Sequence, residues 1–140
     1  MLLSRKGILA IAAVIDVAIH SETRPVSAKA LAIRHGLPPR HLEPVLQALV
    51  HQGILRGVRG PRGGYELGRE PQRITADEIL RAAGTVDDNS EPHLPGSQLV
   101  GEVVLPAIAQ AEKTFSAALG EINVDALVRR ASRAQVHTGH

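Results

Sequence analysis

The sequence of 140 residues contains no cysteine and almost no aromatic side chains. Without thiols it can form no disulfide, no thiolate metal site and no cysteine nucleophile. Tyr65 and Phe115 are its only aromatic residues, so Leu, Ile, Val and Ala must fill the interior. Hydrophobic residues still make up 44% of the chain, which is sufficient for one compact domain with an additional helix or tail.

Long apolar runs are also missing. No segment approaches the roughly 20 residues needed to cross a bilayer, and the most apolar stretch, residues 7–19, is interrupted by Asp16. The start MLLSRKG places basic residues before apolar ones, as signal peptides do, but a charged segment follows instead of a cleavage pattern. We therefore expect a soluble protein without a membrane partner.

Charge is distributed unevenly along the chain. Residues 1–65 hold nine Lys and Arg against three Asp and Glu, a charge of +6, and residues 66–140 hold seven against eleven, a charge of −4. A basic first half suits a polyanionic partner, although an ordinary solvated surface can give the same division.

Apolar residues at helical spacing predict three helices in the first third of the chain. The first covers about residues 4–21. The second follows Ser27, a favourable N-cap, and ends at Gly36. The third starts near Pro39, which suits the first helical position, and ends at Gly53. Two short helices joined by a short glycine-containing turn are the geometry of a helix-turn-helix.

The third helix has two chemically different faces. Its apolar face, expected to be buried, consists of Leu42, Val45, Leu46, Leu49 and Val50. Its opposite face carries side chains that can hydrogen-bond a base edge or a phosphate, or merely contact solvent, namely Arg40, Glu43, Gln47 and His51. Pro44 lies about one turn into this helix, and we expect a small kink or a later helix start.

Two extended segments follow, residues 54–58 and 65–69, separated by the loop RGPRGG. They predict a β-hairpin, which in this position is the wing of a winged helix. Its arginines are placed to contact phosphates or to enter the narrow minor groove, and they are Arg56, Arg59 and Arg62. The turn itself is expected to consist of Gly60, Pro61, Gly63 and Gly64.

The second half of the chain predicts a short helix, a polar loop and a long helix. The capping-box pattern at Thr75 starts the short helix, which ends at Gly84. The long helix, with a bend expected at Pro106, carries an apolar stripe without a partner in its own chain, and a second copy of the chain is the economical partner. The predicted dimer contacts are Val100, Val103, Val104, Ala107, Ala111 and Phe115.

The chain is thus expected to divide into four parts. Residues 1–84 would form a winged helix-turn-helix DNA-binding domain, 85–97 a loop, 98–120 a dimerisation helix, and 121–140 a short helix, capped by Asn123, with a tail. The predicted fold class is mostly α with a small β-hairpin.

Three segments carry a resemblance to a known family: LLSRKGILAIAAVIDVA, LPPRHLEPVLQALVHQGIL, and VRGPRGGYELGRE followed by ITADEIL. They are similar to the bacterial regulators of the IscR and NsrR type, the Rrf-two family, and the hairpin sequence is the most specific of them. The resemblance implies a cytoplasmic homodimer that binds a near-palindromic operator in double-stranded DNA. It also implies DNA contacts by Arg40, His41 and Glu43 and, in the wing, by Arg59, while Arg62 stands where many relatives have a smaller residue.

The loop at 85–97 departs from the family pattern. Members that bind an iron–sulfur cluster place three cysteines there, and this chain has none, so neither a cluster nor another cofactor is expected. His93 could supply a metal together with neighbouring carboxylates, but the spacing fits no standard site. Those carboxylates are Asp87, Asp88 and Glu91.

The sequence therefore predicts a sequence-specific DNA-binding transcription regulator, most simply a repressor. No catalytic grouping of side chains stands out, so an enzyme is not expected. Two alternatives remain open: an adaptor that acts mainly through a protein partner such as a metabolic enzyme, and a metal-sensing regulator that uses His93.

Overall fold

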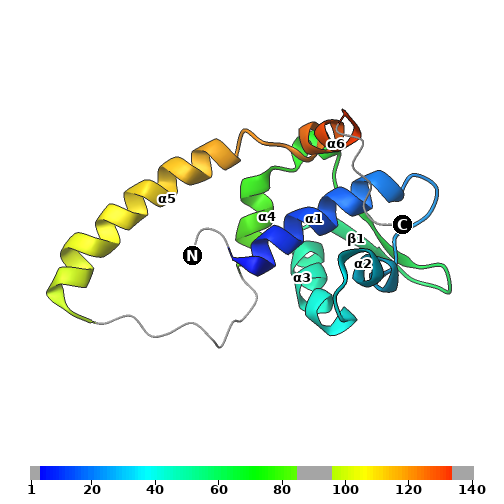
Figure 1. Cartoon of the computed structure of the whole chain (residues 1–140), viewed down its shortest axis with the longest axis horizontal. Coiled ribbons are helices and arrows are strands. Elements are labelled where there is room, and N and C mark those ends of the chain that lie inside the picture. The colour runs from blue at the N-terminus through cyan, green and yellow to red at the C-terminus, as the bar shows by residue number, and fades with distance from the viewer. Residues whose placement is uncertain (1–3, 85–95, 134–140) are drawn as a thin grey trace.

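Helices dominate the computed structural model, which describes residues 4–84 and 96–133 (Figure 1). The first half contains α1 (Arg5–His20), α2 (Ala28–His35), α3 (Pro39–His51), β1 (Leu55–Val58) and β2 (Gly64–Leu67). The second half contains η1 (Pro71–Arg73), α4 (Ala76–Ala83), η2 (Val100–Val104), α5 (Leu105–Leu119) and α6 (Val124–Arg133). The expected class, mostly α with one small hairpin, is confirmed.

The first helices begin and end where the capping residues require. The hydroxyl of Ser4 accepts a hydrogen bond from the N–H of Gly7, and that of Ser27 accepts one from Ala30, both at 3.0 Å. Gly36 ends α2 in the left-handed conformation, at φ 64°. The predicted start of α2 and its end at Gly36 are confirmed.

Helix α3 begins at Pro39 and continues through Pro44. The later start considered for this helix is therefore wrong. Pro39 occupies the first helical position, where a backbone N–H would have no acceptor within the helix, so proline costs no hydrogen bond there. Pro44 removes only one further hydrogen bond, and the helix retains its buried face, because Leu42, Val45 and Leu46 are almost completely inaccessible.

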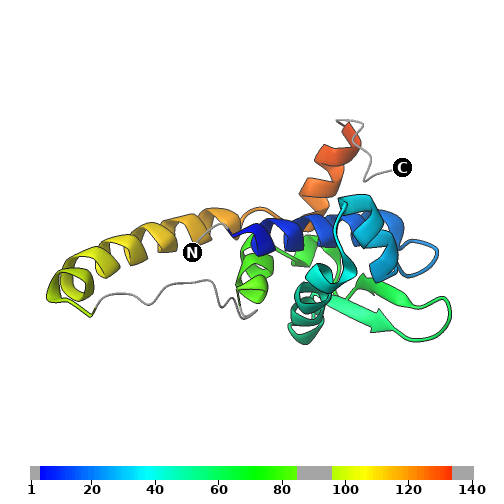
Figure 2. The same ribbon diagram turned by 60° about the horizontal axis from the view of Figure 1, so that its bottom comes forward.

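The core is aliphatic and lies between α1, α3, α4 and the hairpin (Figure 2). Helix α1 crosses the body and supplies its inner face, and α3 lies against it with the apolar face that the sequence predicted. The buried residues of these two helices are Ala10, Ala13, Val14, Val17, Leu42, Val45, Leu46 and Leu49. Because no large ring fills the centre, close packing of branched side chains positions α3.

Backbone hydrogen bonds connect the hairpin to the loop before α2. Strands β1 and β2 pair antiparallel, from Leu55 opposite Leu67 to Val58 opposite Gly64. Val26 adds an isolated bridge: its N–H donates to the carbonyl of Tyr65 at 2.8 Å and its carbonyl accepts from the N–H of Tyr65 at 2.7 Å. A Cβ on Gly64 would lie 2.4 Å from the Val26 oxygen, so this approach needs glycine.

The chain returns to the body through α6. The N–H of Val124 donates to the carbonyl of Ile74, and the N–H of Ala76 donates to the carbonyl of Ile122, both at 2.8 Å. Val124 is fully buried. The predicted cap is confirmed, because Oδ1 of Asn123 accepts from the N–H of Ala126 at 2.8 Å. The sequence did not predict that this segment joins the core.

Between these elements, η2 and α5 extend away from the body as one long helical rod (Figures 1 and 2). Its first part is a π-helix, in which the N–H of Leu105 donates to the carbonyl of Val100, five residues back. The wide turn lies directly before Pro106, whose ring would clash with a carbonyl in a regular α-helix. No side chain of α5 is buried. Within the described ranges, no helix is long and apolar enough to span a membrane.

Candidate nucleic-acid interface

The outer face of α3 is exposed to solvent. The side chains that the sequence assigned to it are all exposed, namely Arg40, Glu43, Gln47 and His51, and His41, which the family resemblance added, is exposed beside them. Within residues 4–84 and 96–133, none of them has a hydrogen-bond or ion-pair partner. These side chains are therefore available to an external ligand, while the opposite face of the same helix anchors it to the core.

The wing presents two further unpaired arginines. Gly60 adopts a φ of 119°, which favours glycine, and its carbonyl accepts from the N–H of Gly63 at 2.9 Å. This tight turn leaves Arg59 and Arg62 exposed, and neither has a polar partner in the part of the chain that the structure describes. Gly64, expected in the turn, instead begins β2, because it pairs with Val58.

Arg56 differs from the other wing arginines. It lies on β1, opposite Glu66 of β2, and its Nε donates to Oε1 of Glu66 at 2.8 Å. Its Nη2 contacts the same oxygen. The pair is largely exposed, so it adds little stability, but it offsets part of the charge that Arg56 would present to an external anion.

The structure also brings the start of α1 close to α3. A groove of about 620 Å³ lies between the two helices, with Leu9 and Pro44 in its wall and Arg5, Lys6 and Arg40 among its other lining residues. Sequence reasoning missed Arg5 and Lys6 because nothing in the local pattern shows that residues 5 and 40 meet. Their charges add to that of Arg40 at one edge of α3.

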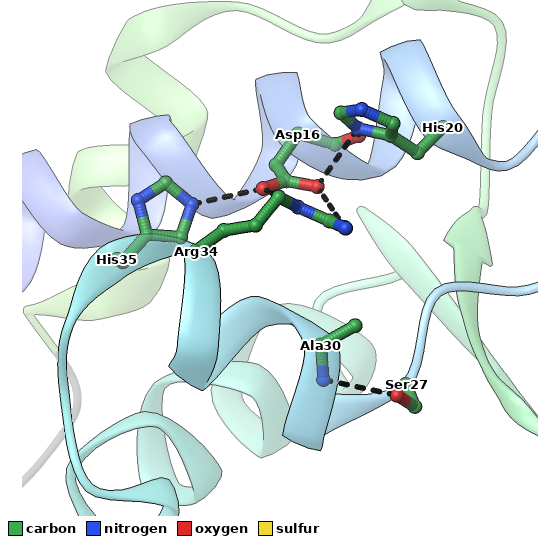
Figure 3. A network of polar contacts seen from close by, with 6 residues as sticks. All are labelled: Asp16, His20, Ser27, Ala30, Arg34 and His35. Carbon is green, nitrogen blue, oxygen red and sulfur yellow. Dashed lines mark hydrogen bonds and ion pairs between the residues drawn. The ribbon is translucent and has the colours of Figure 1, made fainter. Parts of the chain in front are cut away.

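A buried carboxylate joins α1 to α2 (Figure 3). Asp16 is completely inaccessible, and Arg34 of α2 donates to it twice, from Nε to Oδ2 at 2.9 Å and from Nη2 to Oδ1 at 2.6 Å. Nε2 of His35 lies 3.0 Å from Oδ2, and Nδ1 of His20 lies 3.1 Å from Oδ1. This Asp16 network fixes α2 on α1 through directional bonds, and α3 follows α2 after a short turn.

The Asp16 network also affects the ionisation of its arginine. The hydrogen bond to Asp16 raises the pKa of the Arg34 guanidinium. Partial burial lowers this pKa, and the negative charge of Asp16 raises it. The sequence showed Asp16 only as an interruption of an apolar run. A lone carboxylate on the inward face of an otherwise apolar helix is the signal that could have revealed this network.

The donor atoms present do not fit a metal centre. Both oxygens of Asp16 already accept the guanidinium of Arg34, so the two nearby histidines do not complete an open ligand set. Among the described residues, no group of three metal-ligating side chains is placed to hold an ion. His93 and its neighbouring carboxylates, proposed from the sequence as a metal site, lie outside the described residues.

The predicted dimer helix is uncovered in the single chain. Val103, Val104, Ala107 and Ala111 are exposed, and Val100 and Phe115 are half-buried. Large apolar side chains that the sequence did not assign to a dimer contact share this exposure, namely Leu99, Leu105 and Ile108. The rod therefore presents apolar surface to solvent along most of its length.

Comparison with known proteins agrees with this arrangement of helices and wing. A family model described as "Rrf2: Iron-dependent Transcriptional regulator" matches residues 3–130. The chain belongs to the Rrf2 family. This is the Rrf-two family that the sequence segments resemble, and its members are regulators rather than enzymes. The chain is therefore a transcription regulator with a winged-helix DNA-binding fold.

Individual relatives cover almost the whole chain. The HTH-type transcriptional regulator IscR of Xenorhabdus nematophila is 33% identical over 131 residues, which are 92% of this chain and 80% of that protein. The solved structure of T. potens IscR superimposes with a TM-score of 0.74 at 29% identity, over 99% of this chain and 94% of that one. CymR, the global cysteine regulator of B. subtilis, gives 0.68 at 26% identity, over 93% and 98% of the two chains.

The description "iron-dependent" does not extend to cysteine-ligated iron in this Rrf2 member. The 140 residues contain no thiol, so no thiolate can hold an iron–sulfur cluster. Family membership thus supports DNA-binding transcription regulation and assigns no cluster-dependent step to this chain.

Proposed function

We propose that this Rrf2-family regulator is a repressor that binds a near-palindromic operator as a homodimer. The observation that carries the proposal is that the polar face of α3 and the arginines of the wing are exposed and unpaired, while the core and the Asp16 network hold the elements that bear them. In a helix-turn-helix this geometry suits α3 to the major groove and the wing to an adjacent minor groove.

The side chains have distinct roles in this proposal. Arg40 can contact guanine O6 and N7 with two donors, and Glu43 can accept from the amino group of cytosine. Gln47 lies on the same face as these two side chains, and His41 lies at the edge of that face towards α1. Both contact neighbouring bases or phosphates. Arg59 enters the minor groove, where a narrow groove attracts guanidinium groups.

The other two wing arginines contribute differently. Arg62 contacts phosphate from the tip of the wing. Arg56 acts mainly through its charge, which Glu66 partly offsets.

Dimerisation is proposed through η2 and α5. Burial of one large aliphatic side chain contributes roughly 1.5–3 kcal/mol, and this rod exposes several of them without a partner among the residues that the structure describes. A second copy is the economical partner, because a twofold axis brings the same stripe opposite itself. The predicted contacts are Val100, Val103, Val104, Ala107, Ala111 and Phe115. Two winged helices related in this way read two half-sites about one helical turn, roughly 34 Å, apart, and repression follows if such an operator overlaps a promoter.

Selection of bound fragments from genomic DNA, followed by titration of the recovered duplex at several salt concentrations, tests the proposal. Specific binding should be roughly 10³-fold or more tighter than binding to unrelated duplex, and affinity should fall steeply as salt rises. No binding to any DNA at low salt would contradict the proposal, and the adaptor alternative would then take its place.

A further inference from the structure

We propose that the cleft between the wing and α2 is a binding site for a phosphate-type oxyanion. This wing–α2 cleft has a volume of about 520 Å³, within the range of roughly 300–1,000 Å³ of small-ligand pockets. The residues that define its chemistry are Arg24, Ser27, Ala30, Arg34, Arg62 and Gly63.

Three arginines from three different segments converge on the wing–α2 cleft. Arg24 comes from the loop after α1, Arg34 from α2, and Arg62 from the tip of the wing. Arg24 and Arg62 are exposed and have no polar partner among the described residues. No Asp or Glu is among the described residues that line the cleft, but Asp16 offsets the charge of Arg34 from behind the wall. The excess of positive charge therefore comes from Arg24 and Arg62.

The third arginine is held in a fixed position. Both oxygens of Asp16 accept from Arg34, as Figure 3 shows, and its side chain is only 20% exposed. This pair directs one edge of the guanidinium to Asp16 and keeps the group at the cleft wall. A fixed guanidinium loses less conformational freedom on binding an anion than a solvated one does.

Helix α2 adds a further attraction for negative charge. Its first turn starts at Ser27, which lines the cleft together with Ala30. Ser27 Oγ accepts the N–H of Ala30, while the N–H groups of Ala28 and Lys29 have no acceptor within the helix. The positive end of the helix dipole therefore lies beside the arginines, an arrangement that favours phosphate and similar anions.

The walls of the wing–α2 cleft are joined at its base. The two hydrogen bonds between Val26 and Tyr65 connect the loop before α2 to β2, so the wing tip and α2 stand at a defined separation. An anion that contacts both Arg62 and Arg24 would bridge the wing to this loop. The phosphate could belong to the operator backbone or to a free phosphorylated molecule, because both offer the same oxygens to the same guanidinium groups.

The first arm of the test uses free phosphate and does not depend on DNA binding. Backbone amide spectra of the full chain are recorded while sodium phosphate replaces sodium chloride at constant ionic strength. We expect saturable shifts confined to residues 24–30 and 61–64, and Arg24→Gln should weaken the apparent affinity by about tenfold, as for loss of one charge-assisted hydrogen bond. Arg130→Gln on α6, outside the cleft, removes the same charge and should leave the titration unchanged.

The second arm uses duplex DNA and rests on the proposed function. If the cleft holds a backbone phosphate, Arg24→Gln should reduce the slope of log affinity against log salt by about 0.9. Between about 50 and 200 mM salt, wild type should then lose about 3.5-fold more affinity than the variant does. Arg130→Gln should keep the wild-type slope.

The two arms separate the sources of the anion and the two proposals. A change of slope assigns the cleft to the operator backbone, whereas a localised phosphate titration with an unchanged slope assigns it to a free phosphorylated ligand. If the wild-type chain binds no duplex but titrates with phosphate, the cleft stands and the proposed function fails. If duplex binds, but Arg24→Gln alters neither the slope nor a localised phosphate response, the oxyanion site is refuted while the proposed function stands.

Discussion

Replacement of Asp16 by Asn should destabilise the chain by about 3 kcal/mol, because it leaves a buried guanidinium without its counter-charge. Loss of one partner from a buried ion pair costs roughly 3–5 kcal/mol. Asp16 is completely buried, whereas the side chain of Arg34 is 20% exposed, so water can solvate part of the orphaned charge. The lower end of that range is therefore the appropriate magnitude.

Urea unfolding followed by circular dichroism measures this loss. With a slope of about 2 kcal/mol per molar urea, the unfolding midpoint of Asp16→Asn should fall by about 1.5 M. A double-mutant cycle with Arg34→Gln isolates the pair, since the second substitution should cost much less once the first is present. His35→Gln provides a comparison, because it removes a neighbour of Asp16 and leaves both guanidinium bonds in place.

Two results would refute this reasoning. A loss of stability below about 1 kcal/mol would match the contribution of a solvent-exposed ion pair and would mean that water reaches Asp16. If the effects of the two single substitutions on the free energy of unfolding were additive, Asp16 and Arg34 would not interact in solution. The raised pKa of Arg34 gives no pH dependence in ordinary buffers, because its stabilising effect is fully present below the usual pKa of arginine and is lost only as the pH rises through the still higher pKa of the folded state.

Three further substitutions test the wing, its attachment and the dimer. Arg59→Ala should weaken operator binding by roughly 1–3 kcal/mol, and an unchanged affinity in a binding titration would remove the wing from the mechanism. Gly64→Ala should lower stability by roughly 1–3 kcal/mol in urea unfolding, because the new Cβ meets the backbone of Val26. Gly57→Ala on the facing strand is the control, because a Cβ there has open space. Equal losses of stability in the two variants would contradict this account. Ala111→Glu should shift sedimentation towards monomer, while Ala109→Glu on the opposite face of α5 should not, and a dimer unaffected by both would place the interface elsewhere.

Features that depend on neighbouring residues were predictable from the sequence. Ser27 and Gly36 mark the bounds of α2 because cap preferences arise within a single turn, and the capping box at Thr75 does the same for α4. The two faces of α3 follow from helical spacing alone. The hairpin was predictable from its glycine-rich loop, although Gly64 was assigned to the turn and proved to be in the strand.

Features that join distant residues were not predictable in this way. The bridge between Val26 and Tyr65 involves one residue pair, which leaves no periodic signal. Docking of α6 depends on a hydrogen bond between residues 50 positions apart, Ile74 and Val124. The Asp16 network and the wing–α2 cleft likewise combine residues from separate segments, so composition shows their charge but not their convergence.

Stability alone is an incomplete explanation for the Asp16–Arg34 pair. An apolar pair of similar volume at a buried position is often as stable as an ion pair or more so. The ion pair differs because it is directional: two bonds from one guanidinium to two oxygens fix the rotation of α2 about α1. Helix α3 follows α2 after a turn of three residues, and the loop before α2 holds the wing through Val26. One buried carboxylate therefore orders α3 and the wing, the two elements proposed to contact DNA, relative to the same helix.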